Sequence, residues 1–183
     1  MQIKDFAKTR IGHSFRHKLI NDPDGTTKII QPKNISSTGL LDFENYPPIQ
    51  TKTVPNNPLV KGEVLFLNKR RFVAAVFNES GQECWTAPGS VIILTLDPAI
   101  VLPKYLALYL NSSKGQQKLN KVTEFSSIPF ITRTNLEKIN IPVPPQEKQK
   151  NLIHLMSTIS RYEKLTIKKT NLLKNILNSE LEF

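Results

Sequence analysis

The chain has 183 residues, enough for one ordinary domain with a hydrophobic core and an appendage. Its 25 lysines and arginines against 15 acidic residues give a net charge of +10, which favours a polyanionic partner, nucleic acid before an anionic membrane surface. The chain lacks a long apolar run and a signal-peptide core, so we expect a cytoplasmic protein without a membrane span.

Strand and loop signals fill the first third of the chain. A strand is predicted over 26–35, because this segment follows an Asp-Gly turn, is rich in isoleucine and meets Pro32, which is expected to end it. The next segment, 36–58, contains four prolines and is predicted to be a long loop. Compact domains keep such loops mainly where they serve a function.

Three apolar runs in the middle of the chain predict buried strands. The runs 62–67 and 72–77 flank the sequence Asn-Lys-Arg-Arg at 68–71, a plausible hairpin tip. A third run, 90–96, is closed by Asp-Pro. Cys84 is the only cysteine, which excludes an internal disulfide and a cysteine-based zinc site, and we expect it to be a small core residue.

Helical periodicity begins after these strands. The segment 103–110 has proline in its first turn and apolar residues at helical spacing, and a second helix is expected over 113–122 after a polar cap. A loop at 125–131, a one-turn helix starting at 134–135 and a short strand at 139–141 are expected to follow. Strands followed by helices indicate an α+β domain of mixed architecture.

The last segment, 146–183, contains neither proline nor glycine and predicts one helix of roughly 35 residues, which would reach roughly 50 Å. Its apolar residues keep to one stripe, so the helix is amphipathic and needs a partner helix. Thr166 and Lys169 interrupt the stripe, which favours packing against another helix over a long regular coiled coil. The interface residues that we predict are Leu152, Leu155, Ile159, Tyr162, Leu173 and Ile176.

Several polar and basic side chains in the predicted loops suit contacts with DNA. Arginine can pair with guanine through two hydrogen bonds, glutamine suits adenine, and cations and small hydroxyls suit phosphates. The same residues could also be a solvated turn, a basic surface loop, a strand end or helix caps. The candidates are Arg10, Ser14, Arg16, Gln31, Lys33, Lys69, Arg70, Arg71, Ser127, Thr132 and Arg133.

Signatures of catalysis are missing from the sequence. It contains no Asp/Glu-x-Lys triplet, no glycine-rich phosphate loop and no Asn-Pro-Pro-Tyr methylation motif. His13, His17 and His154 lie outside any Cys/His cluster, so a metal site is not expected. We therefore predict a chain without catalytic residues, cofactor or metal.

Five stretches, taken in order, resemble one half of a type I restriction-modification specificity subunit. They are GHSFR at 12–16, IIQPKNI at 29–35, KGEVLF at 61–66, LPKYLALYLNS at 102–112, and IPFI at 128–131 continuing to IPVPP at 141–145. The resemblance implies a DNA-binding target recognition domain over 1–144 and a conserved spacer helix over 145–183. It also implies that the chain directs a partner methyltransferase, and with it an endonuclease, to a split site in double-stranded DNA.

Two departures from the family pattern bear on this interpretation. A full-length subunit carries two recognition domains and two spacers, whereas this chain has one of each, so it is expected to be a fragment or a half-subunit that pairs with a copy of itself. The predicted tip at 68–71 stands where the family has a small residue, so it is expected to recognise a DNA target particular to this chain. The implied partners are DNA, the modification subunit and the restriction subunit.

Two other functions fit the residues. A protein-interaction adaptor would use the apolar stripe of the last helix, and its basic surface would be incidental. An RNA-binding module would need a stronger aromatic platform than Phe72, Phe77 or Tyr46.

Overall fold

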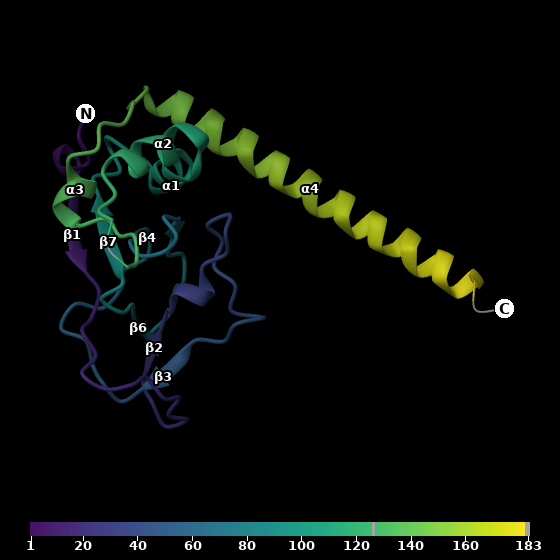
Figure 1. The fold of residues 1–183 in the computed structure, drawn as a ribbon, viewed down its shortest axis with the longest axis horizontal. Coiled ribbons are helices and arrows are strands. Elements are labelled where there is room, and N and C mark those ends of the chain that lie inside the picture. Colours follow the sequence, from purple (N-terminus) through teal and green to yellow (C-terminus); the bar gives the residue numbers. More distant parts are fainter. Residues whose placement is uncertain (126, 182–183) are drawn as a thin grey trace.

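The computed structural model describes residues 1–125 and 127–181. A body of mixed strands and helices is followed by one long helix that runs away from it (Figure 1). The predicted α+β class and the long C-terminal helix are confirmed. Residue 126 of the predicted loop and residues 182–183 of the predicted helix lie outside the described residues.

A four-stranded antiparallel sheet forms the centre of the body. Its strand order is β1-β7-β4-β5, with bounds β1 Ala7–Ile11, β7 Val91–Leu96, β4 Val64–Leu67 and β5 Ala74–Val76. The predicted hairpin is present as β4 and β5, in which Val64 pairs with Val76. Strand β1 was not expected, because its sequence Ala-Lys-Thr-Arg-Ile is half polar and gives no apolar run.

A three-stranded sheet of order β3-β2-β6 lies below the first (Figure 1). Its strands are β2 Thr27–Ile29, β3 Ile49–Thr51 and β6 Cys84–Thr86, and β2 runs antiparallel to β3 and parallel to β6. The strand predicted within 26–35 is present as β2, and it ends at Ile29, before the Pro32 that was expected to end it. Proline cannot donate to a sheet ladder, and here Pro32 begins the short 3-10 helix η2, Pro32–Asn34. Cys84 is half-buried at the start of β6.

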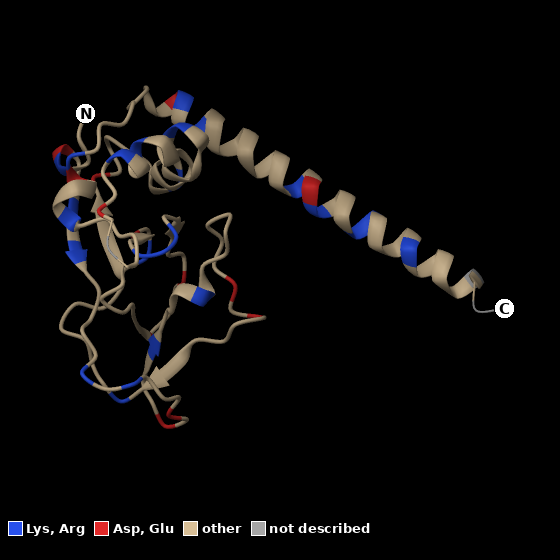
Figure 2. Ribbon diagram, in the orientation of Figure 1, with Lys and Arg blue, Asp and Glu red and all other residues tan. Residues whose placement is uncertain are grey.

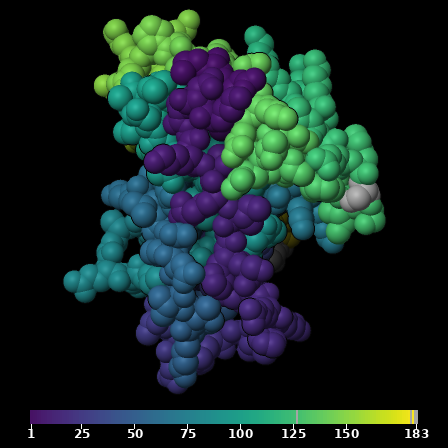
Figure 3. Space-filling model, turned by 90° about the vertical axis from the view of Figure 1, so that its left-hand side faces the viewer, coloured from purple at the N-terminus to yellow at the C-terminus, as the bar shows by residue number. Residues whose placement is uncertain are grey.

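Four helical segments pack against the upper part of the body: η1 Ile3–Asp5, α1 Pro103–Asn111, α2 Ser113–Lys121 and α3 Arg133–Glu137. The Ser112 hydroxyl accepts a hydrogen bond from the Gly115 amide at 3.2 Å and caps α2. The expected strand at 139–141 is wrong: Asn140 makes only an isolated bridge with Gln2. Figure 3 shows the N-terminal segment lying beside this part of the chain, which the 3.1 Å bond from the Ile3 amide to the Ile139 carbonyl explains.

The central sheet is buried on both faces. Side chains alternate along a strand, so Val64 and Phe66 point into the core beneath the helices, while Leu65 and Leu67 point into a second core. This second core contains Trp85 and lies against the three-stranded sheet. The unbroken apolar sequences of β4 and β7 follow from this two-sided burial.

A partly buried ion pair ties β1 to the start of β4. Glu63 is 3% exposed, and its carboxylate accepts hydrogen bonds from the Arg10 guanidinium, from the Thr95 hydroxyl at 2.6 Å and from the Val60 amide at 3.0 Å. Burial alone would raise the pKa of Glu63. The bonds from Arg10, Thr95 and Val60 outweigh it, so the pKa lies below its ordinary value.

The long helix α4, Gln146–Leu181, is fixed to the body at its first turn. The fully buried Gln149 side chain accepts a 2.9 Å bond from the Leu102 amide and donates to the carbonyls of Ile100 and Pro144, both at 2.9 Å. Leu152 and Ile153 pack against the core of the body. Leu152 is therefore half-buried against its own chain, unlike the other predicted interface residues.

From Leu155 onward the apolar stripe of α4 is exposed. The exposed large side chains are Leu155, Met156, Ile159, Tyr162, Leu165, Ile167, Leu172, Leu173, Ile176, Leu177 and Leu181. They include every predicted interface residue except Leu152. Figure 1 shows this part of α4 projecting from the body, so its stripe is not covered by the described part of the chain.

The Gln149 contacts predict that Gln149→Ala lowers the free energy of unfolding by about 1–3 kcal/mol, because buried amide and carbonyl groups lose their partner. Urea unfolding followed by circular dichroism measures this. The exposed neighbour Lys150 provides the control, since Lys150→Ala should change the value by less than about 0.5 kcal/mol. Equal losses in the two variants would contradict the role given to Gln149.

The Glu63 ion pair predicts a stability that depends on pH. Because folding lowers the pKa of Glu63, its stabilisation is complete above the ordinary value of 4.5 and is lost as pH falls through the folded-state pKa. Glu63→Gln should therefore cost about 1.5–3 kcal/mol at pH 7 and progressively less in acid. Urea midpoints between pH 7 and pH 3 test this. The exposed Glu79→Gln is the control, and a cost independent of pH would refute the interpretation.

Candidate nucleic-acid interface

Three loops meet at one edge of the central sheet, where strands β1 and β4 end and strands β5 and β7 begin. The pairs Ile11 with Ile92, Leu67 with Val91, and Phe66 with Ala74 place the end of β1, the β4–β5 turn and the start of β7 together. After β1, the His13 amide donates to the Ala87 carbonyl at 2.7 Å. This edge therefore carries residues that lie far apart in the sequence.

A fourth segment is hydrogen-bonded to the β4–β5 turn. Phe130 bridges both Lys69 and Glu124, the Arg70 amide donates to the Pro129 carbonyl at 3.0 Å, and the Ile131 amide donates to the Asn68 carbonyl at 2.9 Å. We call residues 68–71, 124–125 and 129–131 the tip ribbon. It joins the basic turn and the predicted 125–131 loop into one unit.

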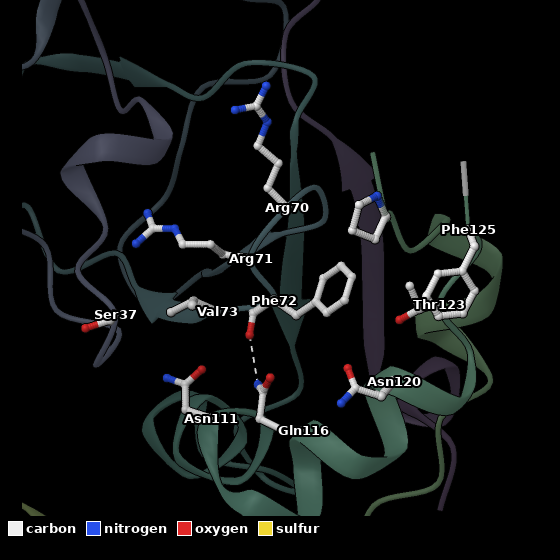
Figure 4. Close-up of a pocket in the computed structure, with 11 residues that line it drawn as sticks. Ser37, Arg70, Arg71, Phe72, Val73, Asn111, Gln116, Asn120, Thr123 and Phe125 are labelled. Atoms are coloured by element: carbon white, nitrogen blue, oxygen red, sulfur yellow. Dashed lines mark hydrogen bonds between the residues drawn. The ribbon is translucent and has the colours of Figure 1, made fainter. Parts of the chain in front are cut away.

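Arg70 occupies a backbone conformation that its side chain disfavours. Its φ is +64°, in the left-handed region, which costs a residue with a Cβ roughly 1–2 kcal/mol. The bond from its amide to Pro129 helps to hold this conformation. The side chain is exposed, and Figure 4 shows it projecting away from the neighbouring side chains. Such strain is concentrated at functional sites in folded proteins.

Arg71 connects the tip ribbon to the second sheet. Its guanidinium donates to the carbonyls of Pro32 at 2.9 Å and Ile35 at 3.0 Å, at the two ends of η2. Lys33 on η2 is exposed beside it. The Gln31 side-chain nitrogen is buried without a partner in the described part of the chain, so it does not face solvent as an adenine reader must.

The N-terminal candidates separate into two groups. Ser14 and Arg16 are exposed in the loop that follows β1, next to the contact between the His13 and Phe15 rings, whose centroids are 4.6 Å apart. Arg10 instead lies in β1, and its guanidinium binds Glu63, which precedes β4, at the opposite end from the tip ribbon.

The remaining candidates flank the tip ribbon. Ser127 is exposed in the loop. The Thr132 hydroxyl accepts a 3.2 Å bond from the Asn135 amide and caps α3, as the alternative interpretation expected. Arg133 is half-exposed and lies 3.6 Å from Glu137 in an ion pair.

A hollow of about 780 Å³ lies between the tip ribbon and the helices α1 and α2. At its base Asn111 exchanges two 2.8 Å bonds with the Ala74 backbone, and the Gln116 amide donates to the Phe72 carbonyl at 2.8 Å (Figure 4). Its lining comprises Ser37, Arg70, Arg71, Phe72, Val73, Asn111, Gln116, Asn120, Thr123, Phe125 and Pro129.

The basic charge is spread over the molecule. Figure 2 shows lysines and arginines on β1, β2, α2 and α4. Among residues 1–125 and 127–181, His, Cys, Asp and Glu form no group of three that could hold a metal ion. The helices of this described part are also too short or too polar to cross a membrane.

The hollow and the exposure of Phe125 were not expected from the sequence. Gln116, Asn120 and Thr123 follow one another at nearly helical spacing, and this pattern could have indicated a polar face on α2. Phe125 gave no signal, because a large apolar side chain such as phenylalanine is normally assigned to the core.

The fold matches solved structures of restriction-modification proteins at low sequence identity. A type I restriction-modification S subunit from M. genitalium aligns with a TM-score of 0.59 and 13% identity, over 88% of this chain and 38% of that one. The HsdS subunit from Thermoanaerobacter tengcongensis aligns with a TM-score of 0.65 and 18% identity, over 88% and 37%. A chain from a study of complex assembly in the type I R-M system aligns with a TM-score of 0.67 and 16% identity, over 88% of this chain and 37% of that one.

This chain thus spans less than two-fifths of the length of these structures. A search of curated proteins found no match. The family described as "Type I restriction modification DNA specificity domain" matches residues 1–177, nearly the whole sequence. With the mixed body and the projecting helix, this match shows that the chain belongs to the family of type I restriction-modification DNA specificity domains.

Proposed function

We propose that this chain is a sequence-specific DNA-recognition module of a type I restriction-modification system. In this role residues 1–144 read the DNA and residues 145–183 act as a spacer. The membership of residues 1–177 in the specificity-domain family is the observation that carries the proposal. The exposed cations at one edge of the central sheet supply the chemistry that it requires.

The tip ribbon is the reading element in this proposal. Lys69 and Arg70 are exposed, and Arg70 can form a bidentate pair with guanine. The other exposed candidates would contact phosphates, and they are Ser14, Arg16, Lys33, Ser127 and Arg133. Arg71 would act mainly by fixing η2 to the ribbon, since its guanidinium already donates to two carbonyls. Arg10, Gln31 and Thr132 are left out, because internal contacts or burial engage their polar groups.

The exposed stripe of α4 is the proposed assembly surface. An apolar stripe of this length is unfavourable in water, and a second helix covers such a stripe in folded assemblies. We propose that it pairs with the spacer of a second recognition half, so that the length of α4 sets the gap of a split DNA site. A modification subunit carrying S-adenosylmethionine, and a restriction subunit, would perform the chemistry, with this chain limited to recognition.

The reading role predicts that Arg70→Gly relaxes the target sequence at one base. Losing a bidentate arginine–guanine pair removes about 1–3 kcal/mol of discrimination, so DNA sites with another base at that position are also methylated. Cells that produce the chain with its modification subunit are compared by methylome sequencing. Glycine accepts a φ of +64°, so the variant should be at least as stable as the wild type.

The matched control is Lys61→Ala, an exposed cation just before Gly62 and β4, at the far end of the strand from the tip ribbon. It should leave the methylated motif unchanged. An unchanged motif in Arg70→Gly would remove Arg70 from the reading site. A wild-type chain that produces no methylated motif would contradict the proposed function itself.

The assembly role predicts that Leu173→Asp disrupts helix pairing. A carboxylate placed in an apolar interface should weaken self-association at least about ten-fold. Sedimentation equilibrium over a range of concentrations measures the dissociation constant. Asn175→Asp introduces the same charge two residues along, on the opposite side of the helix, and should have little effect. A wild-type chain that remains monomeric would show that its helix does not pair with a copy.

A further inference from the structure

Phe125 has an unusual position for a large apolar side chain. It is 85% exposed, more than any other large apolar residue in the described part of the chain. It follows Glu124, whose backbone exchanges bonds of 2.9 Å and 3.1 Å with Phe130. The ring is therefore held out in water by a hydrogen-bonded ribbon, and the body does not bury it.

The surroundings of Phe125 match the chemistry of a nucleobase. The ring lies at the rim of the 780 Å³ hollow, with Thr123 and Asn120 beside it and Arg70 on the far side (Figure 4). The side-chain amide of Asn120 is exposed and has no hydrogen-bond partner within the described residues. An aromatic face can stack on a base, and a free side-chain amide can form hydrogen bonds with the edge of that base.

We infer that Phe125 is a stacking wedge that inserts against one base step of the bound duplex and displaces one base toward the hollow. The inference rests on the proposed DNA-reading function and adds a second mode of recognition to it. The Arg70 contact reads the edge of a base. The wedge instead favours a base step that unstacks easily, so it selects sequence through deformability.

The backbone hydrogen bonds of the tip ribbon make the two modes act together. The Arg70 amide donates to the Pro129 carbonyl, and Phe130 forms bridges with both Lys69 and Glu124, so backbone hydrogen bonds join the cationic turn to the residue before Phe125. A ribbon positioned by Lys69 on the phosphates would therefore bring Phe125 to a defined step. Rigid placement is what an inserted ring requires, because insertion must offset the loss of base stacking.

The test uses the chain assembled with its modification subunit on a duplex that carries the methylated motif. The base analogue 2-aminopurine replaces each adenine in turn, except the one that is methylated, and its fluorescence rises when it unstacks. The wild-type complex should show a rise at one position. Phe125→Ala should abolish this rise and weaken binding by about five-fold to a hundred-fold, whereas Phe125→Tyr should retain both.

Two controls separate the wedge from other effects. Stacking involves no phosphate, so Phe125→Ala should leave the salt dependence of binding unchanged, whereas Lys69→Ala should lower its slope by about one. Val60→Ala removes another exposed apolar side chain, before β4 and away from the tip ribbon, and should change nothing. Because Phe125 is exposed, its variants should unfold at the wild-type temperature.

The outcomes distinguish the wedge from the proposed function. Binding and fluorescence in Phe125→Ala that equal those of the wild type would overturn the wedge and leave DNA reading intact. Equal losses in Phe125→Ala and Val60→Ala would also overturn it. A wild-type complex that binds no duplex would overturn the proposed function, and the wedge with it.

Discussion

The burial of the central sheet on both faces is the constraint on which the rest of the structure depends. Strands β4 and β7 carry apolar side chains on alternate sides, and each side is covered by a different layer, the helices above and the second sheet below. Neither strand can slip by one residue, because a slip would exchange the two sets of side chains. The register therefore fixes which loops reach the edge at the β4–β5 turn. The partly buried Arg10–Glu63 pair ties the other end of the same sheet.

The tip ribbon adds a hydrogen-bonded framework to this fixed edge. Its backbone bonds connect residues near 70 to residues near 130, and Arg71 extends the connection to η2. Much of the conformational freedom of the loops is thus lost during folding. Less remains to be lost on binding, and this preorganisation favours affinity. The positive φ of Arg70 is consistent with this view, because the surrounding contacts maintain a conformation that the residue alone would avoid.

The long helix serves a different purpose from the body. Its first turn is held by Gln149 and by apolar contacts, while the rest carries an exposed stripe. A helix fixed at one end transmits the orientation of the body along its length. In the proposed assembly, a second helix packed on this stripe would hold two reading surfaces at a set distance. The distance between the read bases would then be a property of α4, and the identity of the bases a property of the tip ribbon.

The sequence by itself determined the class of fold and the presence of the long C-terminal helix. The apolar runs at 62–67 and 90–96 predicted the central strands, since burial on two faces leaves a continuous apolar pattern. The proline-free tail predicted α4. Only the tertiary structure decided which candidates lie together: it engaged Arg10 with Glu63, joined Lys69 to Phe130 and left Phe125 in solvent. Hydrogen bonds and ion pairs between distant segments produce these outcomes, and their partners are chosen by packing, which no local pattern of residues encodes.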